Sequence, residues 1–505
     1  MVSLSASVSY WARTEPDRLA IIYADQRVTY GSLRERVEAL AALLHRKGIK
    51  AGEVVALLMK NSSAFLEISL AIGHAGAVML PLNYRLSSEE VDYIVDHAGA
   101  CLIFVDEELE SLAQGCGQRI VVDGECQKDG RYLCEEHSGG TPMLPHQTRP
   151  ESLFRLMYTS GTTDRPKGVT HTYANFYWKC LDHTVVLGLT REDRILVVGP
   201  LYHVGAFDLP GVALLLLGGT MVVLRDFDSN EVLATIARER ITCGWMAPVM
   251  LQRTLTCPER MNHDVSSLKW VIGGGERTPE DRIREFGTVF TNARYIDAYG
   301  LTESCAGDTF MEAGREIEKI GSTGRATPYV QIEIRDELGR AVPPGSDGEI
   351  CLRGPKVTGG YWRDSAKTAA CFHPDGWFRT GDVGHLDVEG FLYLTDRMKD
   401  MIISGGENIA SSEVERVLYL MPEVAEAVAI GMPDEKWGER VVAVVVPRDD
   451  KELTLDAVQA HCRNYLAGFK IPKQLISTST LPRNPSGKVL KRVLREQFKA
   501  VNPVK

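Results

Sequence analysis

A loop of small and hydroxylated residues with one lysine is the stretch of this sequence best suited to chemistry. Residues 158–168 read YTSGTTDRPKG and follow the strand-like segment 153–158. The N–H and O–H groups of such a loop can surround phosphate oxygens, and Lys167 adds a cation. It is not a Walker A loop, because no Gly-Lys-Ser/Thr occurs at the required spacing. Taken alone, the stretch fits either a phosphate-binding loop or a Ser/Thr-rich surface turn.

Five more stretches of unusual composition follow along the chain. They are residues 272–279 (IGGGERTP), 297–303 (DAYGLTE), 377–382 (WFRTGD), 396–408 (DRMKDMIISGGEN) and 482–488 (PRNPSGK). The three glycines 273–275 leave backbone bare, so that a flat ring can approach closely. Tyr299 offers an aromatic face, although a core tyrosine beside a glycine turn would look the same. The carboxylate of Glu303 is a hard oxygen ligand that suits Mg²⁺.

These stretches, in this order and over nearly the whole chain, resemble the adenylate-forming superfamily of ATP-dependent AMP-binding enzymes. Within it, the sequence is most similar to acyl-CoA synthetases of the bacterial fatty-acyl-CoA ligase type; peptide-synthetase adenylation domains and firefly luciferase are other members. The resemblance implies an acid–thiol ligase that converts a carboxylic acid, ATP and CoA into acyl-CoA, AMP and pyrophosphate. The reaction would pass through an acyl-adenylate and use ATP, CoA and Mg²⁺.

The resemblance also implies which residues bind the nucleotide. They are Thr159, Ser160, Gly161, Thr162, Thr163, Lys167, Gly274, Gly275, Glu276, Asp297, Ala298, Tyr299, Gly300, Asp382 and Arg397. Thr302 would touch the α-phosphate region and Glu303 would hold Mg²⁺. Asp382, expected in a tight turn, would accept hydrogen bonds from the ribose hydroxyls. The main catalytic residue would be Lys488, whose ammonium group stabilises the negative charge that gathers at the α-phosphorus.

The same resemblance places the acid and CoA. The acyl pocket is expected from His203, Phe207, Met246 and Val249, a mostly apolar set that favours a hydrophobic fatty, aromatic or alicyclic acid. His203 would flank the carboxylate, although a lone histidine is more often structural. Lys399 would be the hinge about which the small domain turns after adenylation. CoA contacts are expected from Gly405, Gly406, Glu407, Trp437, Phe469 and Lys473.

One position departs from the family pattern. Asp164, followed by Arg165, stands where glycine is common. If that position needs a positive φ, aspartate tolerates it better than most residues. Its carboxylate would weaken ATP binding unless Arg165 or Mg²⁺ offsets the charge.

Composition narrows the classes of partner. The net charge of −10, from 57 basic and 67 acidic residues, argues against nucleic acid. The 11 cysteines form no CxxC pair or Cys/His cluster with zinc spacing, which favours a reducing, cytoplasmic setting. The N-terminus lacks the features of a signal peptide. The apolar stretch 206–224 is interrupted by Asp208, Pro210 and Gly218-Gly219, so a buried helix followed by a strand is expected there, and no integral membrane segment.

The order of expected elements gives the fold class. Strands at 54–59, 77–82 and 101–105 alternate with helices at 64–74 and 87–97, the latter opened by a Ser87/Glu90 capping box. We expect residues 115–151 to be irregular and 441–446 to be a strand. The prediction is an α/β N-terminal domain (1–397) with mixed, largely parallel sheets and a smaller barrel-like subdomain. A hinge would join it to a small α+β C-terminal domain (398–505).

Three alternatives compete with the acyl-CoA synthetase. An adenylating enzyme could pass its acyl group to a carrier protein, or the chain could be an amino-acid adenylating domain. No aspartate suited to an α-amino group stands near the pocket segments, and no carrier domain follows Lys505. A nucleotide-binding relative without catalysis is disfavoured because Lys488, Glu303 and Asp382 are all present. A luciferase-like oxygenase is the least favoured. The expected partners are therefore small molecules, and the resemblance leaves a homodimer open.

Overall fold

The chain divides into two compact units. The first comprises Met1–Gln331 and Leu352–Phe378, and the second Ile332–Cys351 and Arg379–Lys505. The computed structural model describes residues 4–115, 117–122, 144–159, 165–275, 278–398, 400–405, 407–448, 453–483 and 489–501. The expected domain boundary after residue 397 stays a prediction.

A six-stranded sheet in the first unit carries the phosphate-loop candidate. Its order is β6-β5-β3-β4-β7-β8, and every pair is parallel except β7 with β8. The strands are β3 (Val54–Leu58), β4 (Val78–Pro81), β5 (Ala100–Asp106), β6 (Arg119–Val122), β7 (Leu153–Thr159) and β8 (Lys167–Thr172). The predicted alternation is confirmed, as is the capping box, in which Ser87 Oγ accepts from Glu90 N and the Glu90 carboxylate accepts from Ser87 N. Strand β6 corrects the prediction that all of 115–151 is irregular; residues 123–143 lie outside the described part.

A nine-stranded sheet forms the other half of the first unit, in the order β15-β14-β13-β12-β11-β9-β10-β1-β2. Its strands are β1 (Leu19–Tyr23), β2 (Gln26–Thr29), β9 (Arg194–Val197), β10 (Thr220–Val223), β11 (Cys243–Met246), β12 (Trp270–Gly273), β13 (Arg294–Tyr299), β14 (Thr309–Phe310) and β15 (Arg325–Ala326). The strands from β1 through β13 in this order pair in parallel, and β2, β14 and β15 are antiparallel additions at the edges. The largely parallel sheets agree with the prediction.

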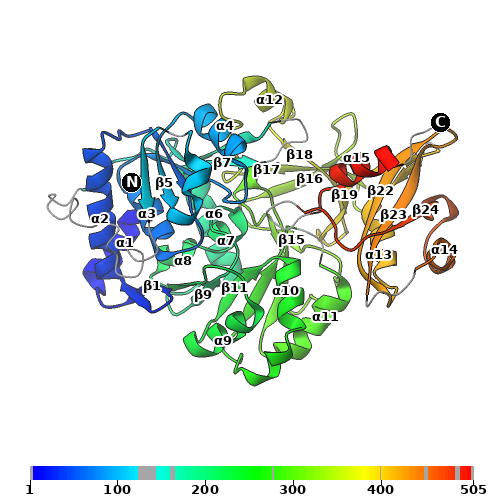
Figure 1. Cartoon of the computed structure of the whole chain (residues 1–505), viewed down its shortest axis with the longest axis horizontal. Coiled ribbons are helices and arrows are strands. Elements are labelled where there is room, and N and C mark those ends of the chain that lie inside the picture. Colours follow the sequence, from blue (N-terminus) through cyan, green and yellow to red (C-terminus); the bar gives the residue numbers. More distant parts are fainter. Residues whose placement is uncertain are drawn as a thin grey trace. The chain divides into compact units, whose positions relative to one another are not determined.

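Helices fill the space between the two sheets and cover their outer faces (Figure 1). The helices of this unit are α1 (Leu4–Thr14), α2 (Tyr30–Arg46), α3 (Ser63–His74), α4 (Ser88–Ala98), α6 (Tyr173–Leu187), α7 (Val204–Asp208), α8 (Ala213–Leu217), α9 (Ser229–Glu239), α10 (Pro248–Leu255), α11 (Glu280–Val289) and α12 (Ser365–Ala370). Every residue of α3 is buried, because α3 contacts both β4 and β1. On the far face of the nine-stranded sheet, α9, α10 and α11 contribute Val232, Leu251 and Phe286 to one core cluster.

The apolar stretch 206–224 is not one helix and a strand but two short helices, α7 and α8, followed by β10. Pro210 lies between the helices, where its missing N–H and fixed φ end helical hydrogen bonding. Among the described residues, no helix is long and apolar enough to cross a membrane.

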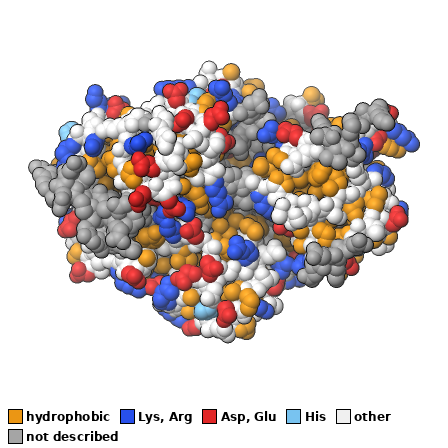
Figure 2. Space-filling model, viewed as in Figure 1, with side chains coloured by type: hydrophobic (Ala, Val, Ile, Leu, Met, Phe, Trp, Pro, Cys, Tyr) orange, Lys and Arg blue, Asp and Glu red, His pale blue; other side chains and the backbone are white. Residues whose placement is uncertain are grey.

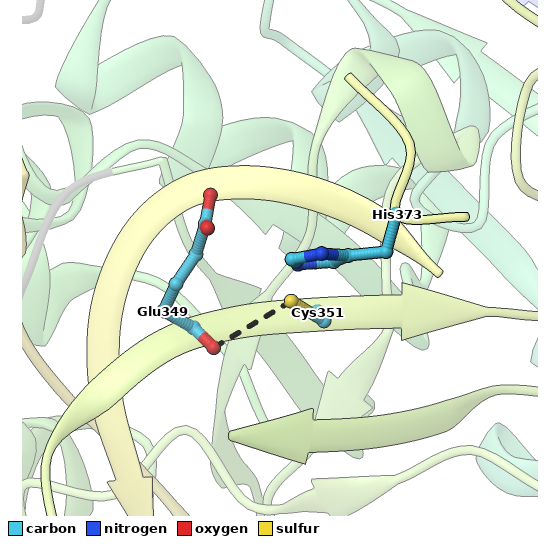
Figure 3. Close-up of side chains that lie close together, drawn as sticks. All are labelled: Glu349, Cys351 and His373. Atoms are coloured by element: carbon cyan, nitrogen blue, oxygen red, sulfur yellow. Dashed lines mark hydrogen bonds between the residues drawn. The ribbon is translucent and has the colours of Figure 1, made fainter. Parts of the chain in front are cut away.

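The described strands of the second unit form two sheets. Strands β16 (Gln331–Arg335), β17 (Gly348–Arg353), β18 (Phe378–Leu386) and β19 (Leu392–Arg397) form most of one, in that order. Within β17, the Cys351 Sγ lies 3.7 Å from the main-chain oxygen of Glu349 (Figure 3). The second sheet has the order β21-β20-β23-β22, with β24 paired to β23; its strands are β20 (Ile402–Ser404), β21 (Glu407–Ile409), β22 (Val424–Asp434), β23 (Gly438–Pro447) and β24 (Gln474–Ser477).

Both faces of the second sheet are covered, which explains its apolar sequence. On one face, Val441, Ala443 and Val445 pack in a cluster with α13 (Ser411–Leu418) and α14 (Leu455–Cys462). On the other, Val442 and Val444 pack in a cluster with α15 (Lys491–Val501). The predicted strand 441–446 is therefore confirmed as part of β23.

The surface carries charges of both signs. Acidic and basic side chains are interspersed on the face seen in Figure 2. The eight cysteines in the described part of the chain are free thiols, six of them buried.

Candidate active site

The phosphate-loop candidate connects two antiparallel strands. Strands β7 and β8 pair so that Thr159 lies opposite Lys167, and the loop between them closes this hairpin. Ser160, Gly161, Thr162, Thr163 and Asp164 lie outside the described residues, so their predicted contacts with phosphate stay predictions. Of the loop's flanking cations, Arg165 stacks over the ring of Tyr93 at 5.0 Å, whereas Lys167 faces a carboxylate.

Lys167, Glu303 and Tyr361 form a closed cluster in the first unit. The Lys167 ammonium donates to the Tyr361 hydroxyl at 2.6 Å and lies 3.1 Å from Glu303 Oε1. The Tyr361 hydroxyl donates to the same Oε1 at 2.9 Å. The cluster thus joins the predicted phosphate lysine and the predicted metal carboxylate, and it adds a tyrosine that the sequence analysis missed.

The donor set at this cluster fits Mg²⁺ together with phosphate. Glu303 is only 8% exposed, and among the described residues its carboxylate contacts one ammonium and one hydroxyl group. Mg²⁺ in nucleotide sites is commonly held by one or two carboxylates and by the substrate's phosphate oxygens. Glu303 would hold the ion and Lys167 would meet phosphate; bound there, Mg²⁺ would neutralise phosphate charge.

The turn that carries Thr302 and Glu303 is held by buried side chains. His171 on β8 accepts a hydrogen bond at Nδ1 from Arg155 Nε at 2.9 Å. Its Nε2 therefore carries the ring proton and donates to the Thr302 carbonyl at 2.7 Å. Burial lowers the pKa of His171 to about 3, which keeps it neutral. The turn continues through Cys305 and Ala306, both with positive φ. Such non-glycine conformations persist where surrounding contacts hold them.

A buried group of charges lies behind this turn. Asp208 at the end of α7 pairs with Arg155 at 2.6 Å and with Lys179 at 3.0 Å, and all three side chains are fully buried. Burial would raise the pKa of Asp208, but Arg155 and Lys179 lower it below its ordinary value. Lys356, also fully buried, donates to the carbonyl of Ala306 at 3.1 Å and to that of Gly307. The network therefore links α7, the β7–β8 hairpin and the Glu303 turn.

The glycines near the predicted adenine site have two different roles. A Cβ at Gly273 would overlap the Tyr295 hydroxyl, and a Cβ at Gly274 would lie 2.9 Å from the Ala298 carbonyl, so both are required by packing between β12 and β13. Gly275 has φ of +95°, and no described atom lies within 4 Å of the position a Cβ would take. Only this third glycine fits the expectation of bare backbone open to a ring, and Glu276 lies outside the described residues.

Strand β13 and the residue after it hold the other predicted nucleotide residues. Asp297, Ala298 and Tyr299 are buried, and Asp297 Oδ1 accepts from the Ala298 N–H at 3.0 Å. Gly300 lies directly against the Glu303 turn: a Cβ at this position would be only 2.3 Å from the Gly307 nitrogen. These residues and the Glu303 turn thus form one continuous segment.

His203 lies at the N-terminal end of α7 beside Trp245. Its Nδ1 accepts from the Gly205 N–H at 3.0 Å, and its ring is stacked on Trp245 with centroids 6.1 Å apart. Burial lowers the pKa of His203 to about 4, so the ring is neutral near pH 7. The Trp245 indole fits there because Gly199 and Gly205 lack side chains; a Cβ on either would lie 2.4 or 2.6 Å from the indole.

The other predicted acyl-pocket residues are less clearly grouped with His203. Met246 belongs to the core cluster of the nine-stranded sheet, and strand alternation turns its neighbour Trp245 to the opposite face. Phe207 is 1% exposed and lies 5.3 Å from the Arg155 guanidinium, whereas Val249 is half-buried in α10. Trp245 is thus the pocket candidate that sequence reasoning missed, because an apolar residue inside a strand carries no chemical signature.

In the second unit, Asp382 and Arg397 face each other across β18 and β19. They occupy opposite positions in the register, and Arg397 Nε lies 3.2 Å from Asp382 Oδ1. Asp382 is within strand β18 rather than in the tight turn that we expected, although the preceding Gly381 does have a positive φ of 72°. The pair is suited to hydrogen bonding with a diol, because a carboxylate accepts and a guanidinium donates.

Some of the predicted CoA residues are neighbours in the second unit. Gly405 follows β20, which pairs antiparallel with β21 so that Ser404 lies opposite Glu407. Gly405 N donates to the Trp437 carbonyl at 2.7 Å, and a Cβ at Gly405 would lie 2.9 Å from the indole. Trp437 and Phe469 are 44% and 42% exposed, and Lys473 Nζ lies 3.4 Å from the Gly468 carbonyl. Lys399, Gly406 and Lys488 lie outside the described residues.

Comparison with known proteins places this geometry in a family. Residues 8–362 match the model of the AMP-binding enzyme family, and residues 413–488 match the AMP-binding enzyme C-terminal domain. A feruloyl-CoA synthase of Amycolatopsis sp. is 37% identical over 96% of this chain and 97% of its own length. An indoleacetate–CoA ligase of Aromatoleum aromaticum is 34% identical over 98% of both chains.

Solved structures agree with this assignment. The o-succinylbenzoate CoA synthetase of Bacillus subtilis in complex with its acyl-adenylate intermediate has a TM-score of 0.87 at 31% identity, over 98% of this chain and 97% of its own. The same enzyme in complex with ATP and a magnesium ion has a TM-score of 0.85 at 31% identity, over 98% and 99% of the two chains. The resemblance noticed in the sequence and the predicted fold class are confirmed. The chain belongs to the AMP-binding enzyme family.

Proposed function

We propose that this protein is an ATP-dependent acyl-CoA synthetase that activates a hydrophobic, aromatic carboxylic acid. In the first half-reaction the carboxylate oxygen attacks the α-phosphorus of ATP, and pyrophosphate leaves. In the second, the CoA thiol, after losing its proton, attacks the acyl carbon, and AMP leaves with the carboxylate oxygen it received. ATP, CoA and Mg²⁺ are the expected small-molecule partners.

The observation that carries this proposal is the Lys167–Glu303–Tyr361 cluster at the end of the phosphate hairpin. It offers a cation for phosphate and a buried carboxylate for Mg²⁺ within 3.1 Å of each other. Relatives named for CoA ligation match over almost the full length of the chain, which supports the same chemistry here. Catalysis by Lys488, hinge motion at Lys399 and CoA contacts at Gly405 and Trp437 remain part of the proposal.

The stacked rings of His203 and Trp245, in the proposed acyl pocket, support the aromatic character of the acid. Two stacked rings favour a flat ligand, because aromatic rings pack by offset stacking or edge-to-face contact. The Trp245 Nε1 is buried, and no described residue accepts its hydrogen. A buried donor without a partner is costly, so a ligand with a hydrogen-bond acceptor would be favoured. The feruloyl and indoleacetate names of two relatives point in the same direction.

The test is an acid panel with three products measured. The protein is incubated with ATP, Mg²⁺, CoA and cinnamic, hydroxycinnamic, arylacetic, benzoic or fatty acids, and AMP, pyrophosphate and thioester are quantified. We expect equal amounts of all three with an aromatic acid. AMP without thioester would point to a carrier protein as acceptor, and thioester with fatty acids alone would refute the aromatic assignment.

A matched pair of variants ties the activity to this site. Glu303→Gln removes the proposed metal carboxylate and should abolish AMP formation. Glu312→Gln, at a half-exposed glutamate paired with Arg325 at 3.0 Å, should leave the activity unchanged.

A further inference from the structure

Residues 358–362 form a short strap between the phosphate hairpin and the Glu303 turn. On one side, Trp362 N donates to the Gly168 carbonyl at 2.7 Å, and Thr170 N donates to the Gly360 carbonyl at 3.1 Å. On the other side, Thr358 N donates to the main-chain carbonyl of Glu303 at 2.7 Å. The main chain of the 358–362 strap is therefore fixed to both parts of the site.

Tyr361 is the side chain that this strap presents to the site. It is 7% exposed, and its hydroxyl accepts from Lys167 and donates to Glu303 at 2.6 and 2.9 Å. Burial, and then the neighbouring Glu303 carboxylate, raise the pKa of Tyr361 above its ordinary value, so the hydroxyl keeps its proton. The Lys167 ammonium also lies 4.2 Å from the centre of the Tyr361 ring.

We propose that Tyr361 is a positioning residue that sets the Glu303 carboxylate for Mg²⁺ and the Lys167 ammonium for phosphate. The proposal rests on the function proposed above. The Tyr361 hydroxyl bonds to both Lys167 and Glu303, so neither charged group has the other as its single partner in the cluster. Without the hydroxyl, Lys167 and Glu303 would keep only their direct ion pair, which magnesium-bound ATP must separate in order to bind both groups.

The expected effect is that Mg²⁺ strengthens ATP binding less than in the wild type. The ratio of the ATP affinity in Mg²⁺ to that in EDTA is called the Mg²⁺ benefit. ATP is titrated calorimetrically without any carboxylic acid, once in saturating Mg²⁺ and once in EDTA. In Tyr361→Phe, the ratio of the two affinities should fall about tenfold, the scale of one hydrogen bond to a charged group. The strap's main-chain bonds and the ring remain in this variant, so the melting temperature should stay close to that of the wild type.

Two further variants make the test specific. Tyr177→Phe is a matched control, because the Tyr177 hydroxyl is buried and bonds to no described residue; its Mg²⁺ benefit should equal that of the wild type. In Glu303→Gln the benefit should vanish, and adding Tyr361→Phe should then reduce it no further. Such non-additivity distinguishes positioning of Glu303 from a general effect on the fold.

Several results would overturn the proposal. One is a Tyr361→Phe variant with the same Mg²⁺ benefit as the Tyr177 control, and another is a variant that weakens ATP equally in Mg²⁺ and in EDTA. A wild-type affinity for ATP that is indifferent to Mg²⁺ would also overturn it. Failure of the proposed function has a different signature, which is no AMP with any acid of the panel, and the ATP titration still decides the role of Tyr361 in that case.

Discussion

Asp208 is a fully buried carboxylate between two fully buried cations, and its replacement by asparagine tests whether this network holds the site together. Asp208→Asn keeps the shape of the side chain but leaves Arg155 and Lys179 without the charge that lies 2.6 and 3.0 Å from them. Removing one partner of a buried ion pair costs about 3–5 kcal/mol, because the remaining charge stays desolvated.

The magnitude converts into a measurable shift of the melting temperature. An unfolding entropy of ~2 cal/mol/K per residue gives about 0.7 kcal/mol/K for a unit of this size. The expected decrease in melting temperature is therefore about 4–7 °C. It is measured by calorimetry, and tryptophan fluorescence follows the unfolding of the first unit in parallel. ATP binding should weaken as well, because Arg155 orients His171, which donates to the Thr302 carbonyl.

Asp264→Asn is the matched control. Asp264 pairs with Arg240 at 2.8 Å, but both side chains are more than half exposed, so the change should leave the melting temperature within error. An Asp208→Asn protein that melts within about 1 °C of the wild type, or no lower than the Asp264 control, would refute the view that this network supports the Glu303 turn.

Four other substitutions give further predictions. Because the pKa of His171 is about 3 in the folded protein and near 6.5 when unfolded, the unfolded state binds more protons as pH falls below about 6.5; His171→Gln should therefore lose less melting temperature between pH 7 and 5 than the wild type. Trp245→Phe should lose any preference for acids that carry a hydrogen-bond acceptor, seen as a change in relative kcat/KM across the panel. Gly405→Ala would place a Cβ 2.9 Å from Trp437 and should slow thioester formation from prepared acyl-adenylate but not pyrophosphate release. Asp164→Gly should keep its activity without an increase in the KM for ATP.

The sequence was informative where local pattern and fold agree. Strands such as β3 and β23 could be predicted from their apolar runs, which the structure buries on both faces. Helix α4 could be predicted from its capping box, which is a local signal. Lys167 and Glu303, which the sequence assigned separately to phosphate and to Mg²⁺, lie 3.1 Å apart in the structure. These residues belong to loop motifs whose composition is unusual on its own.

The rest depends on contacts between residues far apart in the chain. Tyr361 and Glu303 are 58 positions apart, and Asp208 is 53 positions from Arg155, so no local pattern links them. Trp245 and Met246 are adjacent apolar residues on β11, and their side chains point to opposite faces of the sheet. Only the structure shows that Trp245 is the one beside His203. The tight turn expected at Asp382 was wrong because β18 continues through a glycine with positive φ.

The most direct test of the central claim follows an oxygen atom. The acid identified by the panel is labelled with ¹⁸O in its carboxylate and incubated with ATP, Mg²⁺ and CoA, and the AMP is analysed by mass spectrometry. An acyl-adenylate mechanism predicts one ¹⁸O in the phosphate of AMP for each thioester formed, because the carboxylate oxygen that attacks phosphorus leaves with AMP. Unlabelled AMP, or ADP in its place, would contradict the account.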